Sequence, residues 1–192
     1  RVLTVEIDRR LHALLVEDGL PGNVELLRSD ALALEPADLA AKLGTDWKLV
    51  ANLPYEITSK TLEKFLPMRS RTGTGPTSIT LMLQKEVGER ILAKPGAMNR
   101  LALFCGYYSV PARLFSVARG AFSPPPNVDS CVIRLDVRED VALDGDEEAL
   151  FFRLIEAAFS EKRKQIKNTI GGLLGPAASD RLAAAGLSLS VR

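Results

Sequence analysis

The feature of this sequence that most constrains its fold is an alternation of strand-like and helix-like segments from Val2 to Val137. Short runs rich in Val, Ile and Leu predict strands at residues 2–7, 24–27, 47–51, 78–83, 110–117 and 128–137. Helical spacing of apolar residues predicts helices at residues 8–17, 37–43, 58–66, 86–93 and 99–107, and residues 70–76 predict a mobile loop. This alternation predicts an α/β fold with a mostly parallel, doubly wound sheet, which ends in an antiparallel pair.

The composition changes after Arg138. Residues 138–148 (R-E-D-V-A-L-D-G-D-E-E) are acidic and predict a linker. The segments beyond it show only helical spacing, with Phe151, Ile155 and Ala158 recurring on one face. We therefore predict two domains, a sheet domain at residues 1–138 and a small all-α domain at residues 139–192.

Charge and cysteine content narrow the class of protein. The 192 residues carry a formal net charge of +1, so local clusters rather than total charge must indicate any polyanionic partner. No apolar run is long enough to cross a membrane. The cysteines, Cys105 and Cys131, lie far apart in apolar segments, which favours a reducing, cytoplasmic location over a disulfide framework. The single histidine, His12, has no metal-ligating pattern around it, so we expect no metal site.

Polar residues follow three successive predicted strands, at Glu6, Asp30 and Asn52. In an open α/β sheet, ligands bind at the carboxyl ends of the strands. A carboxylate there can accept both protons of a ribose diol, and an aspartate one strand further can bind an adenine amino group. A lone acidic residue at a strand end is more often a surface residue or a helix cap, which suits Asp8. Three in succession favour a nucleotide-like cofactor.

Residues 52–55 (N-L-P-Y) are an unusual end for a strand. They resemble the [ND]-x-P-[YF] motif of enzymes that methylate exocyclic amines with S-adenosylmethionine. The lone pair of such an amine is delocalised into its ring, and acceptors against its N–H groups aim that lone pair at the methyl group. The Asn52 side chain and the Leu53 or Pro54 carbonyl can accept, and Tyr55 offers a stacking face for an extruded base. The alternative is a turn with a core tyrosine.

Several further motifs occur in order along the chain. These are V-E-I-D at 5–8, M-L-Q-K-E-V at 82–87, N-R-L-A-L at 99–103, A-F-S-P-P-P-N-V-D-S at 121–130 and A-F-S-E-K-R-K-Q-I-K-N at 158–168. Together with N-L-P-Y, this set resembles the rRNA adenine N6,N6-dimethyltransferases of the bacterial KsgA type over nearly the whole chain.

The resemblance implies a Rossmann-like methyltransferase sheet and a helical RNA-binding domain. It implies dimethylation of the N6 atoms of two adjacent adenines in the hairpin loop near the 3′ end of 16S rRNA, with a role in ribosome biogenesis. The partner would be the small ribosomal subunit, and the enzyme a monomer. The cofactor would be S-adenosylmethionine, with Glu6 on the ribose, Asp30 on the adenine, Ala31 also in the cofactor site, and Asn52 between cofactor and target. Phe122 would face Tyr55 across the target base, unless it is an ordinary core residue.

A basic cluster lies in the C-terminal region at Lys162, Arg163, Lys164 and Lys167. A charge run of this kind is often only a solvated helix face. The family resemblance favours contact with RNA phosphates instead.

The sequence departs from the family pattern at its beginning. No glycine-rich loop and no first strand precede Val2, and the C-terminal helical region is shorter than the family's. We therefore expect these 192 residues to lack part of the sheet and to be inactive alone. A non-catalytic rRNA-binding assembly factor and a DNA adenine methyltransferase remain alternatives.

Overall fold

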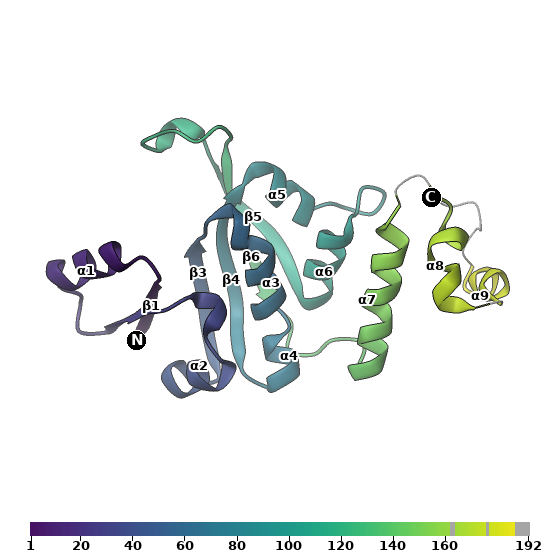
Figure 1. Cartoon of the computed structure of the whole chain (residues 1–192), viewed down its shortest axis with the longest axis horizontal. Coiled ribbons are helices and arrows are strands. Elements are labelled where there is room, and N and C mark those ends of the chain that lie inside the picture. Colours follow the sequence, from purple (N-terminus) through teal and green to yellow (C-terminus); the bar gives the residue numbers. More distant parts are fainter. Residues whose placement is uncertain (162–163, 176, 187–192) are drawn as a thin grey trace. The chain divides into compact units, whose positions relative to one another are not determined.

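A computed structural model describes residues 1–161, 164–175 and 177–186 of the chain. The chain forms two compact units, Arg1–Leu92 with Cys105–Asp140 and Ala93–Phe104 with Val141–Arg192 (Figure 1). The second unit begins close to the predicted domain boundary, but it also takes up Ala93–Phe104, which we had assigned to the sheet domain. The assignment of catalysis and RNA binding to the two domains stays a prediction.

The larger sheet of the first unit has the strand order β3-β4-β6-β5. Its strands are β3 (Asp46–Asn52), β4 (Gly75–Gln84), β5 (Ser109–Val117) and β6 (Ser130–Val137). β3 and β4 are parallel, whereas β6 is antiparallel to both β4 and β5. The structure therefore confirms the predicted α/β class and the antiparallel pair at the end of the sheet, but the larger sheet is mixed rather than mostly parallel. β6 inserts between β4 and β5, so the two last strands form a hairpin at one edge.

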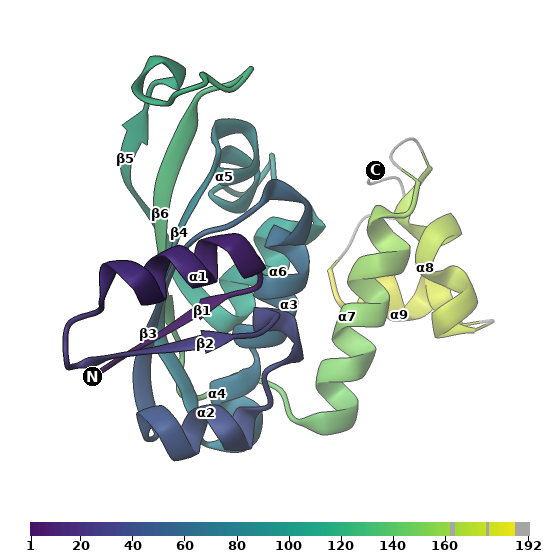
Figure 2. The same cartoon turned by 60° about the vertical axis from the view of Figure 1, so that its left-hand side comes forward.

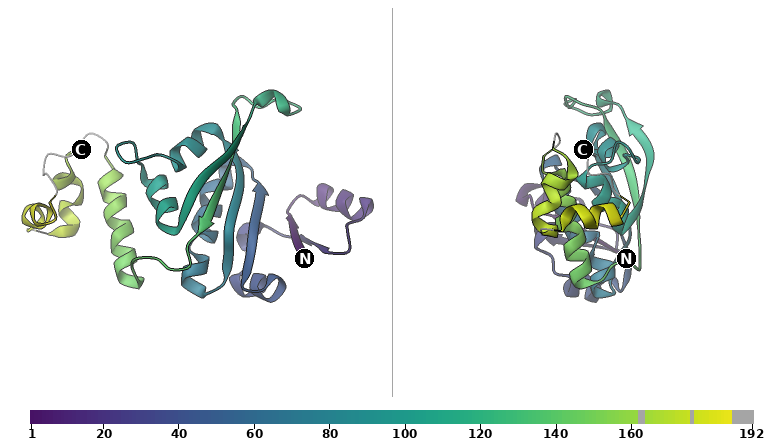
Figure 3. Two further views of the ribbon diagram at one scale, coloured as in Figure 1. Left: turned by 180° about the vertical axis from the view of Figure 1, so that it is seen from behind. Right: turned by 90° about the vertical axis from the view of Figure 1, so that its right-hand side faces the viewer.

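Helices cover one face of this sheet and bury its core. The helices that lie on that face are α3 (Thr58–Phe65), α4 (Met68–Thr72) and α5 (Lys85–Ile91). The left view of Figure 3 shows the other face of the sheet. Fully buried side chains alternate along β4 and β6: Ile79, Leu81, Leu83, Cys131, Ile133 and Leu135. Trp47 of β3 meets Phe65 of α3 edge-on, with ring centroids 6.1 Å apart. Alternation with period two thus places one apolar row of β4 and one of β6 against the helices.

A separate two-stranded ladder pairs β1 (Val2–Glu6) in parallel with β2 (Val24–Arg28). The helix α1 (Arg9–Asp18) connects them, and Figure 2 brings this segment forward. Asp8 caps α1 by accepting hydrogen bonds from the N–H groups of Arg10 and Leu11 at 2.7 and 3.0 Å. None of the residues of α1 is buried. Within the described residues no ladder joins β1 to β3, so each of these two strands has one edge without a strand partner.

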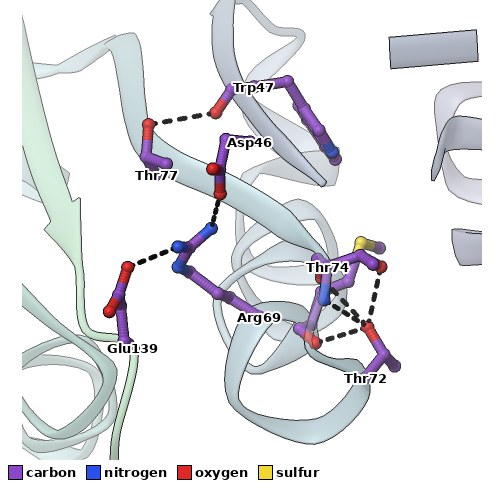
Figure 4. A network of polar contacts seen from close by, with 8 residues as sticks. Asp46, Trp47, Arg69, Thr72, Thr74, Thr77 and Glu139 are labelled. Atoms are coloured by element: carbon purple, nitrogen blue, oxygen red, sulfur yellow. Dashed lines mark hydrogen bonds and ion pairs between the residues drawn. The ribbon is translucent and has the colours of Figure 1, made fainter. Parts of the chain in front are cut away.

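The predicted mobile loop at residues 70–76 is wrong. The segment forms α4 and the beginning of β4, with Gly73 ending the helix in the left-handed conformation at φ 71°. Arg69 holds this corner, because its guanidinium contacts Asp46 of β3 at 2.6 Å and Glu139, just after β6, at 2.5 Å (Figure 4). These contacts join residues far apart in sequence, which a local pattern does not reveal.

The remaining elements of the first unit are short. They are η1 (Ala31–Ala33), α2 (Pro36–Leu43), η2 (Tyr55–Ile57) and η3 (Arg119–Ala121). The helix α6 (Arg100–Tyr108) begins in the second unit and ends in the first. Asn99 caps it through contacts of its side-chain oxygen with the N–H groups of Leu101 and Ala102 at 3.0 and 3.2 Å.

The second unit contains only helices among its described residues. They include α7 (Gly145–Phe159), α8 (Ile166–Leu174) and α9 (Ala178–Ala184). The predicted linker at residues 138–148 is therefore too long, because α7 takes up its last four residues. Three acidic residues lie in the first turn of α7 (Asp146, Glu147 and Glu148), where negative charge stabilises a helix. No helix in the described ranges has the length and apolarity to cross a membrane.

Candidate functional site

The N-L-P-Y segment lies at the carboxyl end of β3, in the larger sheet. Asn52 is the last residue of the strand, is exposed, and pairs with Met82 of β4. The chain then turns into η2, which begins at Tyr55, and continues directly into α3. A parallel strand followed by a helix N-terminus is the usual place for a ligand in an α/β sheet.

The two candidate carbonyl acceptors of this segment differ. The Pro54 carbonyl accepts a hydrogen bond from the Ile57 N–H at 3.1 Å, which closes the η2 turn. The Leu53 carbonyl makes no such bond to the described backbone. Leu53 and the Asn52 side chain are therefore the acceptors that remain available. The side chain of Tyr55 lies outside the described part of the chain, although its backbone belongs to η2.

The two candidate cofactor carboxylates lie at the carboxyl ends of β1 and β2. One oxygen of Glu6 accepts the Asp8 N–H at 2.7 Å. One oxygen of Asp30 accepts the Leu32 N–H at 2.8 Å, which makes Asp30 the cap of η1. Each carboxylate has a second oxygen that can accept from a ligand. The structure thus shows that the helix-cap interpretation and the binding interpretation of Asp30 are compatible.

The turn after Asp30 is anchored to the helix that follows the N-L-P-Y segment. Lys64 of α3 donates a hydrogen bond to the Leu32 carbonyl at 2.9 Å. The turn that contains Asp30 and Ala31 is therefore tied by one hydrogen bond to α3, which begins at Thr58, six residues after Asn52. Glu6 and Asp30 nevertheless belong to a different ladder from Asn52 in the described residues, so the structure does not bring all three into one sheet.

Phe122 lies in the connection between β5 and β6. This connection lies at the end of the larger sheet where β3 finishes at Asn52. It does so because β3 and β4 are parallel and β6, which follows the connection, is antiparallel to β4. Phe122 is half-buried and directly follows η3, and its N–H contacts the Arg119 carbonyl at 3.3 Å. The Asp129 carboxylate in turn accepts the Arg119 N–H at 3.0 Å. Sequence reasoning missed Asp129, although an aspartate directly before a strand and after a proline-rich turn is a typical capping residue.

The basic cluster is only partly described. Lys164 is exposed and pairs with Glu161 at 2.7 Å, as an i,i+3 surface contact. Lys162 and Arg163 lie outside the described residues, and so does the side chain of Lys167, whose backbone belongs to α8.

The two cysteines are not candidates for a nucleophile. Both are fully buried and unbridged. Burial raises the pKa of Cys105 to about 12 and also raises the pKa of Cys131. Since the thiolate is the reactive form, neither side chain is suited to nucleophilic chemistry at neutral pH.

Comparisons with known proteins agree with this arrangement. Residues 1–189 match the family described as ribosomal RNA adenine dimethylase. The chain is 41% identical over 183 residues to a "Ribosomal RNA small subunit methyltransferase A" of Moorella thermoacetica, covering 90% of the chain and 62% of that protein. It is 38% identical over 177 residues to the protein of that name from Dehalococcoides mccartyi, covering 91% of the chain and 59% of that protein. The chain thus spans about 60% of the length of these curated relatives.

Two solved structures are similar in fold. The 23S rRNA methyltransferase ErmE superposes with a TM-score of 0.72 at 25% identity, covering all of this chain and 75% of that one. A dimethyladenosine transferase from Plasmodium falciparum superposes with a TM-score of 0.69 at 27% identity, covering 96% and 63%. These likenesses confirm the predicted Rossmann-like methyltransferase fold. The chain belongs to the ribosomal RNA adenine dimethylase family.

Proposed function

We propose that this chain forms the part of an S-adenosylmethionine-dependent enzyme that positions an adenine amine of rRNA for methylation. The products would be N6,N6-dimethyladenines at two adjacent positions in the hairpin loop near the 3′ end of small-subunit rRNA, formed in the cytoplasm by a monomer during ribosome biogenesis. The observation that carries this proposal is Asn52 at the end of β3, followed by a Leu53 carbonyl that accepts no hydrogen bond from the described backbone.

The chemistry of the amine explains these residues. The N6 lone pair of adenine is conjugated with the ring and is a poor nucleophile. When Asn52 Oδ1 and the Leu53 carbonyl accept hydrogen bonds from the N–H groups of the amine, the nitrogen becomes more pyramidal and its lone pair is less delocalised into the ring. Pro54 has no N–H, so no donor competes at this position and the backbone is held rigid. The methyl group itself would come from the sulfonium of the cofactor.

The target base needs a holder once it leaves its stack. We propose that Tyr55 and Phe122 hold the adenine between their rings, since base–aromatic stacking contributes about 1–3 kcal/mol per base. Both residues lie in segments that leave the same edge of the larger sheet, which supports this role.

The described residues suit the adenosine side of the cofactor. The second oxygen of Glu6 can accept from the ribose hydroxyls. The second oxygen of Asp30 can accept a hydrogen bond from the adenine amino group. The Ala31 N–H, at the first residue of η1, can donate one to N1 of adenine. We place no residue of this chain against the methionine side. We therefore expect isothermal titration of the 192-residue chain to give weak or no binding of S-adenosylmethionine, and micromolar affinity would contradict this view.

The decisive experiment is Asn52→Ala in the full open reading frame. Transfer of labelled methyl groups to unmethylated small ribosomal subunits should be abolished, while RNA binding should be nearly unchanged, because orientation of the amine acts on the rate. Asn23→Ala is the matched control, since Asn23 is an exposed residue in the turn before β2. Normal turnover by Asn52→Ala would remove Asn52 from the mechanism.

The substrate arms of the same assay separate the alternatives. Labelled methyl on adenine of the small subunit supports the proposal, whereas labelling of adenine in DNA would favour a DNA methyltransferase. Tight binding to small subunits without any transfer would favour a non-catalytic assembly factor. All three outcomes are measured on the whole protein, so none of them requires the helical domain to be tested by itself.

We further propose that Lys162, Arg163, Lys164 and Lys167 contact RNA phosphates. Neutralising all four should weaken RNA binding and flatten its salt dependence, with each lost contact changing the log–log slope by about 0.7 on single strands. Because Lys164 pairs with Glu161, Lys164→Gln alone should have only a small effect. An unaltered salt slope in the quadruple variant would show that the cluster is only a solvated face.

A further inference from the structure

Asp129 makes two backbone-directed hydrogen bonds at the functional edge of the larger sheet. It lies directly before β6 and after the proline-rich loop that carries Phe122. Its carboxylate accepts the Arg119 N–H at 3.0 Å, and its main-chain carbonyl accepts the Lys85 N–H at 3.0 Å. One residue thus holds the start of the loop and the start of α5 to the beginning of β6.

Both bonds go to the first residue of a helix. Arg119 begins η3 and Lys85 begins α5, and the first N–H groups of a helix have no partner within it. The residues that would normally cap these helices are Ala118 and Gln84, and neither provides a side-chain hydrogen bond. Asp129 therefore supplies, from across the hairpin, the acceptors that both helix ends lack locally.

A second hydrogen bond passes this constraint on to Phe122. The carbonyl of Arg119 accepts the Phe122 N–H at 3.3 Å, so the two residues are the ends of one short turn. The last pair of the ladder below the loop is Val117 with Ser130. Beyond that pair, two hydrogen bonds lead from the start of β6 to Phe122. The first joins the Asp129 carboxylate to the Arg119 N–H, and the second joins the Arg119 carbonyl to the Phe122 N–H. The position of Phe122 consequently depends on the Asp129 side chain through these two hydrogen bonds.

We propose that Asp129 is a positioning residue that sets Phe122 against the target adenine. This inference rests on the proposed function for the role of Phe122. The hydrogen bond between the Asp129 carboxylate and the Arg119 N–H, called the latch below, can be tested independently of that function. Asp129 acts through an accepted hydrogen bond, so its charge is not required. Asparagine, whose side-chain oxygen also accepts, should replace it, whereas alanine should not.

The first test is amide hydrogen exchange in the 192-residue chain. In Asp129→Ala the Arg119 amide should exchange about tenfold faster, as expected for a lost cap. The Lys85 amide should keep its protection, because its acceptor is the main-chain carbonyl. Asp129→Asn should resemble the wild type. Asp136→Ala is the control, since Asp136 lies in β6, the strand that follows Asp129, and its carboxylate contacts Arg134. Unchanged exchange at Arg119 in Asp129→Ala would overturn the latch.

The second test is methylation by the full open reading frame with Asp129→Ala, Phe122→Ala and the double variant. Phe122→Ala should lower kcat/KM by roughly five- to hundredfold, by loss of base stacking. Asp129→Ala should lower it less, Asp129→Asn should restore it, and the double variant should be no worse than Phe122→Ala. Effects that multiply in the double variant would show that Asp129 does not act through Phe122.

The two tests separate failure of this inference from failure of the proposed function. If the wild-type protein transfers no methyl group, the proposed function fails. The exchange rate at Arg119 still decides then whether Asp129 holds the loop, and fluorescence of 2-aminopurine at the target position decides whether Phe122 meets a base. An Asp129→Ala variant that keeps the wild-type fluorescence change on RNA binding would contradict the positioning role.

Discussion

The larger sheet and the β1–β2 ladder of the first unit differ sharply in how many apolar side chains they bury. In the larger sheet, β4 and β6 bury unbroken rows of aliphatic side chains, and Leu81 and Ile133 are completely inaccessible. In the β1–β2 ladder no residue is fully buried, and Leu11, Leu14 and Val16 of α1 are 52%, 54% and 60% exposed. Both regions have strands and helices of ordinary length. Only one has a face of side chains that is closed to water.

This difference separates the two halves of the candidate site. The amine-binding segment at Asn52 is attached to the strand β3, which pairs with the buried strand β4. The cofactor carboxylates, Glu6 and Asp30, are attached to the ladder that has little core. Stability of the chain should therefore depend on the larger sheet, whereas order at the cofactor carboxylates should depend on weak local contacts. Four predictions test this contrast, from the largest expected effect to the smallest.

Leu81→Ala and Leu14→Ala remove the same atoms from the two regions. Leu81→Ala should lower the free energy of unfolding by about 2–5 kcal/mol, because it leaves a cavity in a closed core. Leu14→Ala, at a side chain that is half exposed, should change it by less than about 0.5 kcal/mol. Denaturant unfolding followed by circular dichroism measures both. Equal costs would show that α1 is as well packed in solution as β4.

Gly88→Ala should be the next most damaging change. A Cβ atom at Gly88 of α5 would lie 2.2 Å from the sulfur of Cys131 in β6. The overpacking cost of about 1–3 kcal/mol should exceed the gain of roughly 1 kcal/mol from the better helix former. Gly22→Ala, where an added Cβ meets nothing within 4 Å, is the control in the turn that precedes β2. Adding Cys131→Ala to Gly88→Ala should recover part of the loss in a double-mutant cycle, and strict additivity would contradict the contact.

Arg69→Met should destabilise the chain by about 1 kcal/mol, through loss of the two charged contacts that join β3, α4 and the end of β6. The Arg69 side chain is only 12% exposed, although Asp46 and Glu139 are open to solvent. Lys42→Met is the comparison in the smaller ladder, because Lys42 of α2 pairs with Glu25 of β2. It should cost less than Arg69→Met, because Lys42 loses a single partner and its own side chain is 36% exposed, against 12% for Arg69. Thermal unfolding of the two variants side by side would show a reversed order if the contrast were wrong.

The smallest effect concerns pH. Hydrogen bonds from Lys42 and Arg1 lower the pKa of Glu25 below its ordinary value of 4.5. Their contribution to stability is therefore present above pH 4.5 and is lost as the pH falls through the lower native pKa. A carbon-detected NMR titration should give a Glu25 midpoint below 4.5 that moves upward in 1 M salt. Glu25→Gln should remove the acid dependence of amide protection in β2, and a midpoint at the ordinary value would refute the pairing.

Much of this fold could be predicted because the larger sheet obeys local rules. Buried side chains alternate with less buried ones at the centres of β4 and β6, and beside the smaller ladder Asp8 and Gly19 mark the ends of α1 as expected. The segment at 70–76 could not be predicted, since its order comes from Arg69, whose partners lie 23 and 70 positions away. The start of α7 was misread because an acidic, glycine-containing sequence suits both a linker and the first turn of a helix.

The candidate site shows the same division. Asn52 at a strand end and Phe122 in a proline-rich loop could be named from sequence, because motif and position agreed. The availability of the Leu53 carbonyl could not, since it depends on Pro54 accepting the Ile57 N–H. The two roles of Asp129 could not either, because its partners belong to two helices that only the folded hairpin brings to it.

The insertion of β6 between β4 and β5 has a consequence for the order of synthesis. Ser78 to Gln84 of β4 find their second partners only in Ser130 to Asp136, near the end of the first unit. Until the ribosome has released that strand, β4 (sequence S-I-T-L-M-L at its centre) carries a free hydrogen-bonding edge and no charge. At about 5–20 residues per second this interval lasts for seconds. A nascent chain that pauses before β6 therefore presents a strand suited to pairing with another chain, and this interval is when a chaperone would matter most to the protein.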